Sequence, residues 1–239
     1  MADTRNSLQG VKPHKDYFLS GGDLHIIAED REFCVHSYFF LRDSAKFRSL
    51  LASPSPGQPK QGSSHLTAIK LNATAKEFET FLWVFYIPTY SLYEATVSDW
   101  SCILRLAYDW KFDEVGKLAV RELEKMPMPV VDRIALYQEH HVAQDFLVRH
   151  YAALCIRGHP LALAESEQLG MATVVLINQA MHAIYSQMRG SDGSSSPIDS
   201  NGELILKIIA HIRKEQGAAA ETAGGSVTIS PSFPLFLDG

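Results

Sequence analysis

Two short stretches of alternating apolar residues, joined by a tight turn, constrain the fold of this chain more than any other feature of its sequence. Residues 23–29 read DLHIIAE and residues 32–36 read EFCVH, and both patterns are typical of strands. Asp30 and Arg31 between them fit a turn. The segment therefore predicts a β-hairpin, and residues 65–72, which alternate again, predict a third strand.

Elsewhere the apolar spacing is that of helices. Phe78, Phe81 and Phe85 recur at intervals of three and four residues, which places them on one helix face. Thr74 followed by Glu77 has the spacing of a capping box, which predicts a helix start there. Helices are expected over residues 37–51, 75–87, 98–107, 113–125, 130–140, 143–157, 160–168 and 170–188.

Composition shifts along the chain predict its domain organisation. Pro127 and Pro129 interrupt the helical pattern and suggest a boundary, and the stretch after residue 189 is rich in Ser and Gly. The expected parts are a flexible N-terminus (1–15), an α/β domain (16–126), a helical extension (127–189), a linker (190–202) and a helix with a flexible tail (203–239).

Charge and cysteine content exclude several classes of protein. The chain has 22 Lys and Arg against 27 Asp and Glu, a net charge of −5, which argues against nucleic acid as a partner. Its longest apolar stretches are too short to cross a bilayer, and residues 1–22 lack the apolar core of a signal peptide, so no membrane is expected. Three widely spaced cysteines suit a reducing compartment, cytoplasmic or nuclear.

Specific residues in this order resemble the BTB/POZ domain family. The resemblance is carried by residues 22–26 (GDLHI), 33–36 (FCVH) and 41–47 (LRDSAKF), with further agreement over residues 71–85 and 100–123. The resemblance covers roughly residues 16–125, about half of the chain. The chain as a whole resembles the divergent BTB proteins of mushroom-forming fungi. It implies an α+β fold, in which a small sheet is flanked by helices and followed by an all-α extension.

The resemblance implies a non-enzymatic protein-interaction module that forms a homodimer and serves as an adaptor or scaffold. In the family the N-terminal segment and the first helix build the dimer. Aromatic residues dominate many interfaces. The interface residues expected on this basis are Tyr17, Phe18, Phe39, Phe40 and Phe47.

Three polar residues of the family pattern are expected to be structural anchors. Asp23 and His36 lie at predicted strand ends, where a carboxylate and an imidazole can satisfy backbone groups or each other. Ser44 is expected to be a buried hydroxyl that bonds a nearby carbonyl. Many transcriptional members place a basic residue after the His, but here that position is Ser37, which removes the positive member of the family's charged pocket.

Other members of the family dock on a cullin through a hydrophobic-x-Glu motif before the penultimate helix. Val97-Ser98-Asp99 stands at about that place, with Asp for Glu. The alternative function is therefore a substrate adaptor of a cullin-type ubiquitin ligase. The competing interpretation is that Ser98 and Asp99 only begin a helix, where a hydroxyl and a carboxylate are favourable.

No motif typical of an enzyme occurs, and no metal or cofactor is expected. The sequence lacks glycine-rich phosphate loops, GxSxG, HExxH and CxxC. The densest group of possible ligands is His140, His141 and Asp145, and on a helix His141 and Asp145 would share a face. A small-molecule-binding or enzymatic helical domain that uses this region is therefore a further alternative.

Overall fold

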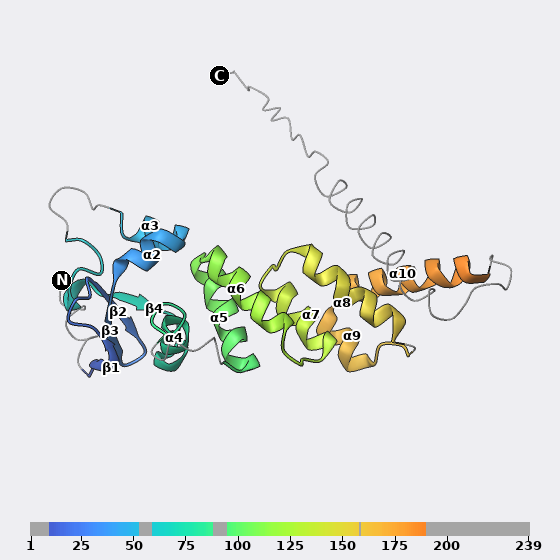
Figure 1. Cartoon of the computed structure of the whole chain (residues 1–239), viewed down its shortest axis with the longest axis horizontal. Helices are drawn as coiled ribbons and strands as arrows, with labels where there is room; N and C mark the ends of the chain where they lie inside the picture. The colour runs from blue at the N-terminus through green and yellow to red at the C-terminus, as the bar shows by residue number, and fades with distance from the viewer. Residues whose placement is uncertain (1–9, 53–58, 88–94, 158, 190–239) are drawn as a thin grey trace, which may run out of the picture. The chain divides into compact units, whose positions relative to one another are not determined.

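The chain has a mixed α+β fold with a helical extension, as the sequence predicts. The computed structural model describes residues 10–52, 59–87, 95–157 and 159–189, with the side chains of the last helix described up to His182. These residues form two compact units. The first extends to Met128 and includes Glu139–His141, and the second comprises Pro129–Gln138 and the residues from Val142 on (Figure 1). The linker expected at 190–202 and the helix and tail expected at 203–239 lie outside the described residues.

A four-stranded sheet forms the N-terminal part of the first unit. Its strands are β1 (Lys12–Phe18), β2 (Leu24–Ala28), β3 (Arg31–Val35) and β4 (Ile69–Leu71), in the order β1-β3-β2-β4. The hairpin of β2 and β3 is antiparallel, with Leu24 opposite Val35, and Glu29 turns the chain with φ of 56°. β1 pairs in parallel with β3 and begins at Lys12, inside the segment that the sequence suggested would be flexible.

Five helices of this part of the chain surround or follow the sheet in the residues that the structure describes. They are α2 (Ser37–Asp43), α3 (Ala45–Leu50), α4 (Ala75–Leu82), α5 (Val97–Trp110) and α6 (Asp113–Glu124). The single helix predicted over 37–51 was wrong, because Ser44 is extended and separates α2 from α3. The strand predicted over 65–72 is only β4, because a short 3₁₀ helix, η1, occupies His65–Thr67.

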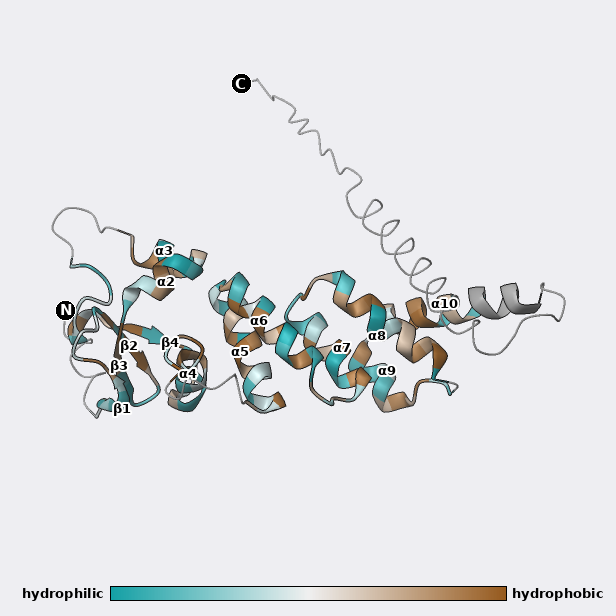
Figure 2. Cartoon of the chain, viewed as in Figure 1, coloured by the Kyte–Doolittle hydropathy of each residue, from teal (hydrophilic) through white to brown (hydrophobic). Residues whose placement is uncertain are grey.

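Aromatic rings make up the centre of the first unit. Phe40 packs edge-on against Phe47 with ring centroids 4.8 Å apart, and Phe81 lies 5.1 Å from both Trp110 and Phe112. Figure 2 shows hydrophobic residues along α4 and α5, the helices that carry much of this core. Burying rings of this size contributes most of the hydrophobic stabilisation of a small domain.

The second unit is helical throughout its described residues. Its helices are α7 (Val130–Glu139), α8 (Gln144–Ile156), α9 (Leu163–Leu169) and α10 (Met171–Arg189). Apolar side chains of α7, α8 and α10 form its core. Gln138 ties three of these helices together, because its amide donates to Tyr151 on α8 at 3.1 Å and to Thr173 on α10 at 2.6 Å. Among the described helices, none is long and apolar enough to cross a membrane.

Candidate interaction surface

The five aromatic residues expected at a dimer interface differ in their exposure. Phe40 and Phe47 have 0% exposed surface, because both rings belong to the core of the chain itself. The prediction that these two residues lie at the dimer interface was therefore wrong. Phe18, at the end of β1, is 43% exposed, whereas Phe39 is half-buried and Tyr17 is buried. Of these five residues, only Phe18 and part of Phe39 are therefore exposed and able to contact a second copy of the chain.

The outer side of α2 carries Tyr38, the most exposed of the Phe, Tyr and Trp side chains that the structure describes, and the sequence analysis missed it. Tyr38 is 61% exposed, and the guanidinium of Arg42 lies 5.3 Å from its ring centre and 5.5 Å from that of Phe39. Arg42 also donates two hydrogen bonds to Asp43, at 2.7 and 2.6 Å. We call Tyr38, Phe39 and Arg42 the α2 aromatic patch.

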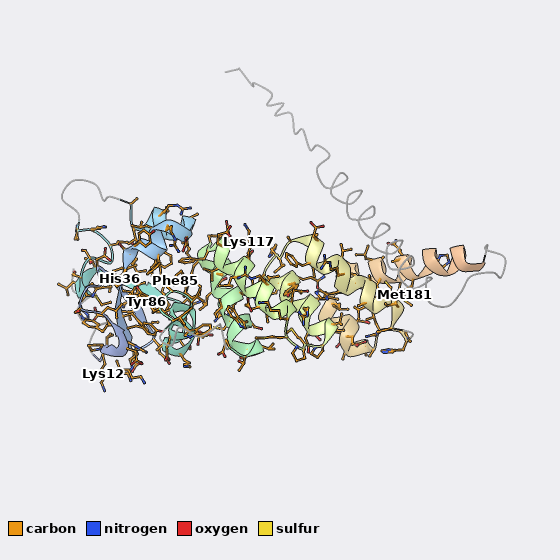
Figure 3. The ribbon with its side chains drawn as sticks, in the orientation of Figure 1. Lys12, His36, Phe85, Tyr86, Lys117 and Met181 are labelled. Carbon is orange, nitrogen blue, oxygen red and sulfur yellow. The ribbon has the colours of Figure 1, made fainter. Side chains whose placement is uncertain are left out.

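The inner side of this patch packs on rings from the residues that follow α4, which ends at Leu82. Phe39 packs on Phe85 at 5.2 Å and on Tyr86 at 5.4 Å, and Tyr86 in turn holds His36 (Figure 3). The Tyr86 hydroxyl accepts a hydrogen bond from the backbone N–H of His36 and lies 2.9 Å from its Nδ1. Phe85 and Tyr86 therefore hold the Phe39 ring of the patch in place.

Asp23 and Ser37 form the polar link between β2 and α2. The Ser37 backbone N–H donates to one carboxylate oxygen of Asp23 at 2.7 Å, and the Ser37 hydroxyl donates to the other at 2.6 Å. Partial burial acts to raise the pKa of Asp23, but these hydrogen bonds outweigh it and the pKa is lowered. The partner of Asp23 is thus Ser37 rather than His36, and no basic side chain is needed to satisfy it.

Ser44 is a fully buried hydroxyl, as the sequence suggested. It donates to the carbonyl of Trp110 at the end of α5, and it accepts from the backbone N–H of Phe47 at 3.0 Å. It therefore caps α3 and connects that helix to α5 at the same time.

The residues of the possible cullin motif lie inside the first turn of α5 rather than before it. The helix is capped by Thr96 and not by Ser98, which is a correction to the sequence analysis. The Asp99 carboxylate accepts from the Thr96 N–H at 3.0 Å and from its hydroxyl at 2.7 Å, while Val97 is half-buried. Asp99 thus acts as the acidic member of a capping box.

The ligand-like group His140, His141 and Asp145 is not brought together. α7 ends at Glu139 and α8 begins at Gln144, so His141 and Asp145 do not share a helix face as the sequence predicted. His141 adopts φ of 50° and stacks on Tyr108 at 5.1 Å, and burial lowers the pKa of His140. Among the residues that the structure describes, no three His, Cys, Asp or Glu side chains are placed so that they could hold a metal ion.

A second polar cluster, which the sequence analysis also missed, lies on the hairpin. The buried Glu32 carboxylate bridges two imidazoles, with His25 Nδ1 at 2.8 Å and His65 Nδ1 at 2.9 Å. His25 Nε2 lies 3.7 Å from the Cys34 sulfur. The order thiol, imidazole, carboxylate is that of a nucleophilic site. Burial, together with the nearby Glu32 and Asp23, raises the pKa of Cys34, which keeps it a protonated thiol.

Comparisons with known proteins add no relative to this description. No model of a known protein family matches the chain, and a search of curated proteins finds no match either.

Proposed function

We propose that this chain is a non-enzymatic protein-interaction module of the BTB/POZ type, which forms a homodimer through the α2 aromatic patch. The observation that carries the proposal is the exposed Tyr38 ring under the Arg42 guanidinium. Tyr and Arg are among the residues that contribute most to binding when they are buried at an interface.

The patch is arranged so that little flexibility is lost on association. Phe39 is packed on Phe85 and Tyr86, and Arg42 is fixed by two hydrogen bonds to Asp43. Immobilising a free side chain at an interface costs about 0.5–1.5 kcal/mol, so side chains that are already ordered favour binding. A surface that pairs with itself also needs only one patch on each copy.

The chemistry of the polar clusters supports a role without catalysis. In the thiol–imidazole–carboxylate cluster the Cys34 side chain is buried and its pKa is raised, whereas a nucleophilic cysteine needs access and a lowered pKa. The Asp23 carboxylate is occupied by Ser37. All three cysteines are free thiols, which agrees with a location in the cytoplasm or nucleus.

Size-exclusion chromatography with light scattering tests the proposal. The wild-type chain of 26.6 kDa should elute at about twice that mass at tens of micromolar protein, because interfaces of standard size bind well below this concentration. Tyr38→Glu should yield monomer with an unchanged circular dichroism spectrum. The matched control is Leu66→Glu, a 69% exposed residue on η1, which should remain dimeric. A monomeric wild type, or a dimeric Tyr38→Glu variant, would contradict the proposal.

A further inference from the structure

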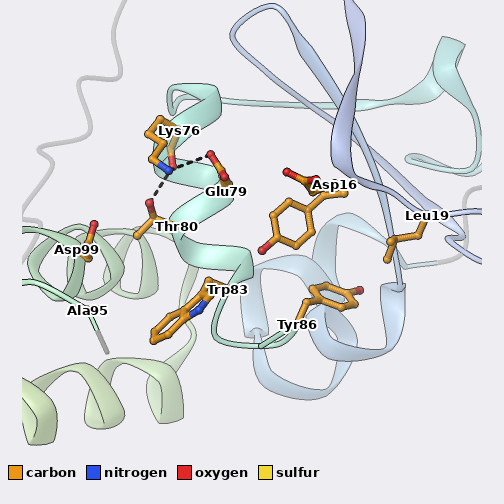
Figure 4. A pocket seen from close by; sticks show the side chains of 10 residues that line it. Asp16, Leu19, Lys76, Glu79, Thr80, Trp83, Tyr86, Ala95 and Asp99 are labelled. Atoms are coloured by element: carbon orange, nitrogen blue, oxygen red, sulfur yellow. Dashed lines mark hydrogen bonds and ion pairs between the residues drawn. The ribbon is translucent and has the colours of Figure 1, made fainter. Parts of the chain in front are cut away.

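A pocket of about 540 Å³ lies beside the end of β1, between α4 and the start of α5 (Figure 4). β1 and the residues after it contribute Asp16, Tyr17 and Leu19, and α4 contributes Lys76, Glu79 and Thr80. Trp83, Tyr86, Ala95 and Asp99 complete the described lining. Its volume is in the range of sites that hold a small molecule or a large side chain.

The lining combines negative charge with aromatic rings. Asp16, Glu79 and Asp99 supply three carboxylates, against the single ammonium of Lys76. Lys76 pairs with Glu79 at 3.1 Å, and its side chain is 78% exposed. Because the carboxylates outnumber the ammonium, the charge of the lining favours a cation. Trp83 and Tyr86 add aromatic rings to the lining, and a delocalised cation is attracted to such rings.

Tyr17 contributes a phenol to the lining of the pocket. The residue is 9% exposed, and its hydroxyl is not among the buried polar atoms that lack a hydrogen-bond partner in the described part of the chain. Burial, with further contributions from Glu79 and Asp16, raises the pKa of Tyr17 to about 12, so it stays a neutral phenol. A neutral phenol oxygen can accept a hydrogen bond, so a ligand that donates one would find an acceptor here.

We propose that this pocket binds an arginine side chain of a partner polypeptide. A guanidinium is planar, so it can stack on Trp83, and it has five donors to share between the Tyr17 oxygen and the carboxylates. A lysine ammonium would satisfy the charge but would lack the flat surface. The inference deepens the proposed role as an interaction module and rests on it, but it concerns a surface other than the α2 aromatic patch.

Nuclear magnetic resonance of the ¹⁵N-labelled full chain can test the inference with blocked arginine, N-acetyl-arginine methylamide, as the probe. The chain has three tryptophans, and all of them lie in the first unit. The indole signal of Trp83 should shift saturably, with a dissociation constant on the order of 1 mM, as expected for so small a ligand. The citrulline analogue, which is nearly isosteric but uncharged, should cause no saturable shift.

Two variants and a control locate the effect. Tyr17→Phe keeps the ring but removes the hydroxyl, and Glu79→Gln removes one charge, so each should weaken binding roughly threefold to fivefold. Glu114→Gln is the matched control, because Glu114 is an exposed carboxylate on α6 that pairs with Lys117, and binding should be unchanged.

Three outcomes would overturn the inference: no saturable Trp83 shift up to about 50 mM arginine probe, an equal response to citrulline, or variants that bind as the wild type does. Light scattering on the same samples separates this inference from the proposed dimer. If the chain is a dimer that does not bind the arginine probe, only the proposal of an arginine-binding pocket is refuted. If it is a monomer that binds the probe, only the proposal of a homodimer is refuted.

Discussion

Replacing Ser44 by alanine should destabilise the first unit more than any other serine-to-alanine change on its helices. The Ser44 hydroxyl is fully buried and makes two hydrogen bonds, one to the carbonyl of Trp110 and one from the N–H of Phe47. Both partners belong to buried residues. Water therefore cannot replace the hydroxyl without a change in the surrounding core.

The expected magnitude follows from the two bonds. Loss of a helix N-cap costs about 1 kcal/mol, and a stranded buried carbonyl costs about 1–3 kcal/mol. Because the two effects share one atom and partial relaxation is expected, we predict a loss of about 2–3 kcal/mol in the free energy of unfolding for Ser44→Ala. With a typical urea dependence for a domain of this size, the midpoint should fall by roughly 1 M or more.

Tryptophan fluorescence during urea unfolding measures the effect in the right part of the molecule. All three tryptophans, Trp83, Trp100 and Trp110, lie in the first unit, so their emission reports on the unfolding of that unit. The matched control is Ser101→Ala, since that hydroxyl, on the half-buried side of α5, only donates to the carbonyl of Val97. It should change stability by less than about 0.5 kcal/mol. If Ser44→Ala matched Ser101→Ala, the reasoning about a shared buried hydroxyl would be refuted.

Three further outcomes follow from local geometry. Thr96→Ala should cost about 1 kcal/mol in the free energy of unfolding while Ser98→Ala costs less than about 0.5 kcal/mol, and the reverse ranking would restore Ser98 as the cap. Gly22→Ala should destabilise strongly in thermal unfolding, because a Cβ would lie 2.7 Å from the backbone of Cys34; an unchanged midpoint would contradict that contact. The lowered pKa of Asp23 contributes stability above its ordinary value of 3.8, and this contribution is lost as pH falls through the lower folded value, so Asp23→Asn should flatten the acid limb of the pH–stability curve.

The hairpin and most helices could be predicted from the sequence because their periodicity is strong and local. β1 could not, and its burial pattern explains why. Within Lys12–Phe18 only His14 and Tyr17 are buried, three residues apart, since the pairing with β3 shifts register between Pro13 and Phe18. A strand with this irregularity shows no alternation, and its place in the sheet depends on a partner elsewhere in the chain.

The interface prediction depended on aromatic character, which does not distinguish an exposed ring from a buried one. It was therefore wrong for aromatic residues that face the core. Phe40 lies on α2 and Phe47 on α3, and both are buried together with Ser44, which separates the two helices. Tyr38 lies two residues before Phe40, on the opposite side of α2, and is exposed. The helical spacing could have separated Tyr38 from Phe40, whereas the cluster of His25, Glu32 and His65 needed the strand register and the position of η1.

The environment of Asp23 links the sequence departure to the proposed surfaces. The resemblance places a basic residue where this chain has Ser37, and Ser37 occupies both oxygens of the Asp23 carboxylate. The carboxylate is therefore satisfied within the chain and presents no unpaired charge to a partner. The carboxylates of Asp16 and Glu79 line the pocket beside β1, while the exposed ring area lies on Tyr38. The proposed contact with a second copy of the chain and the proposed contact with an arginine side chain therefore use different residues of the first unit.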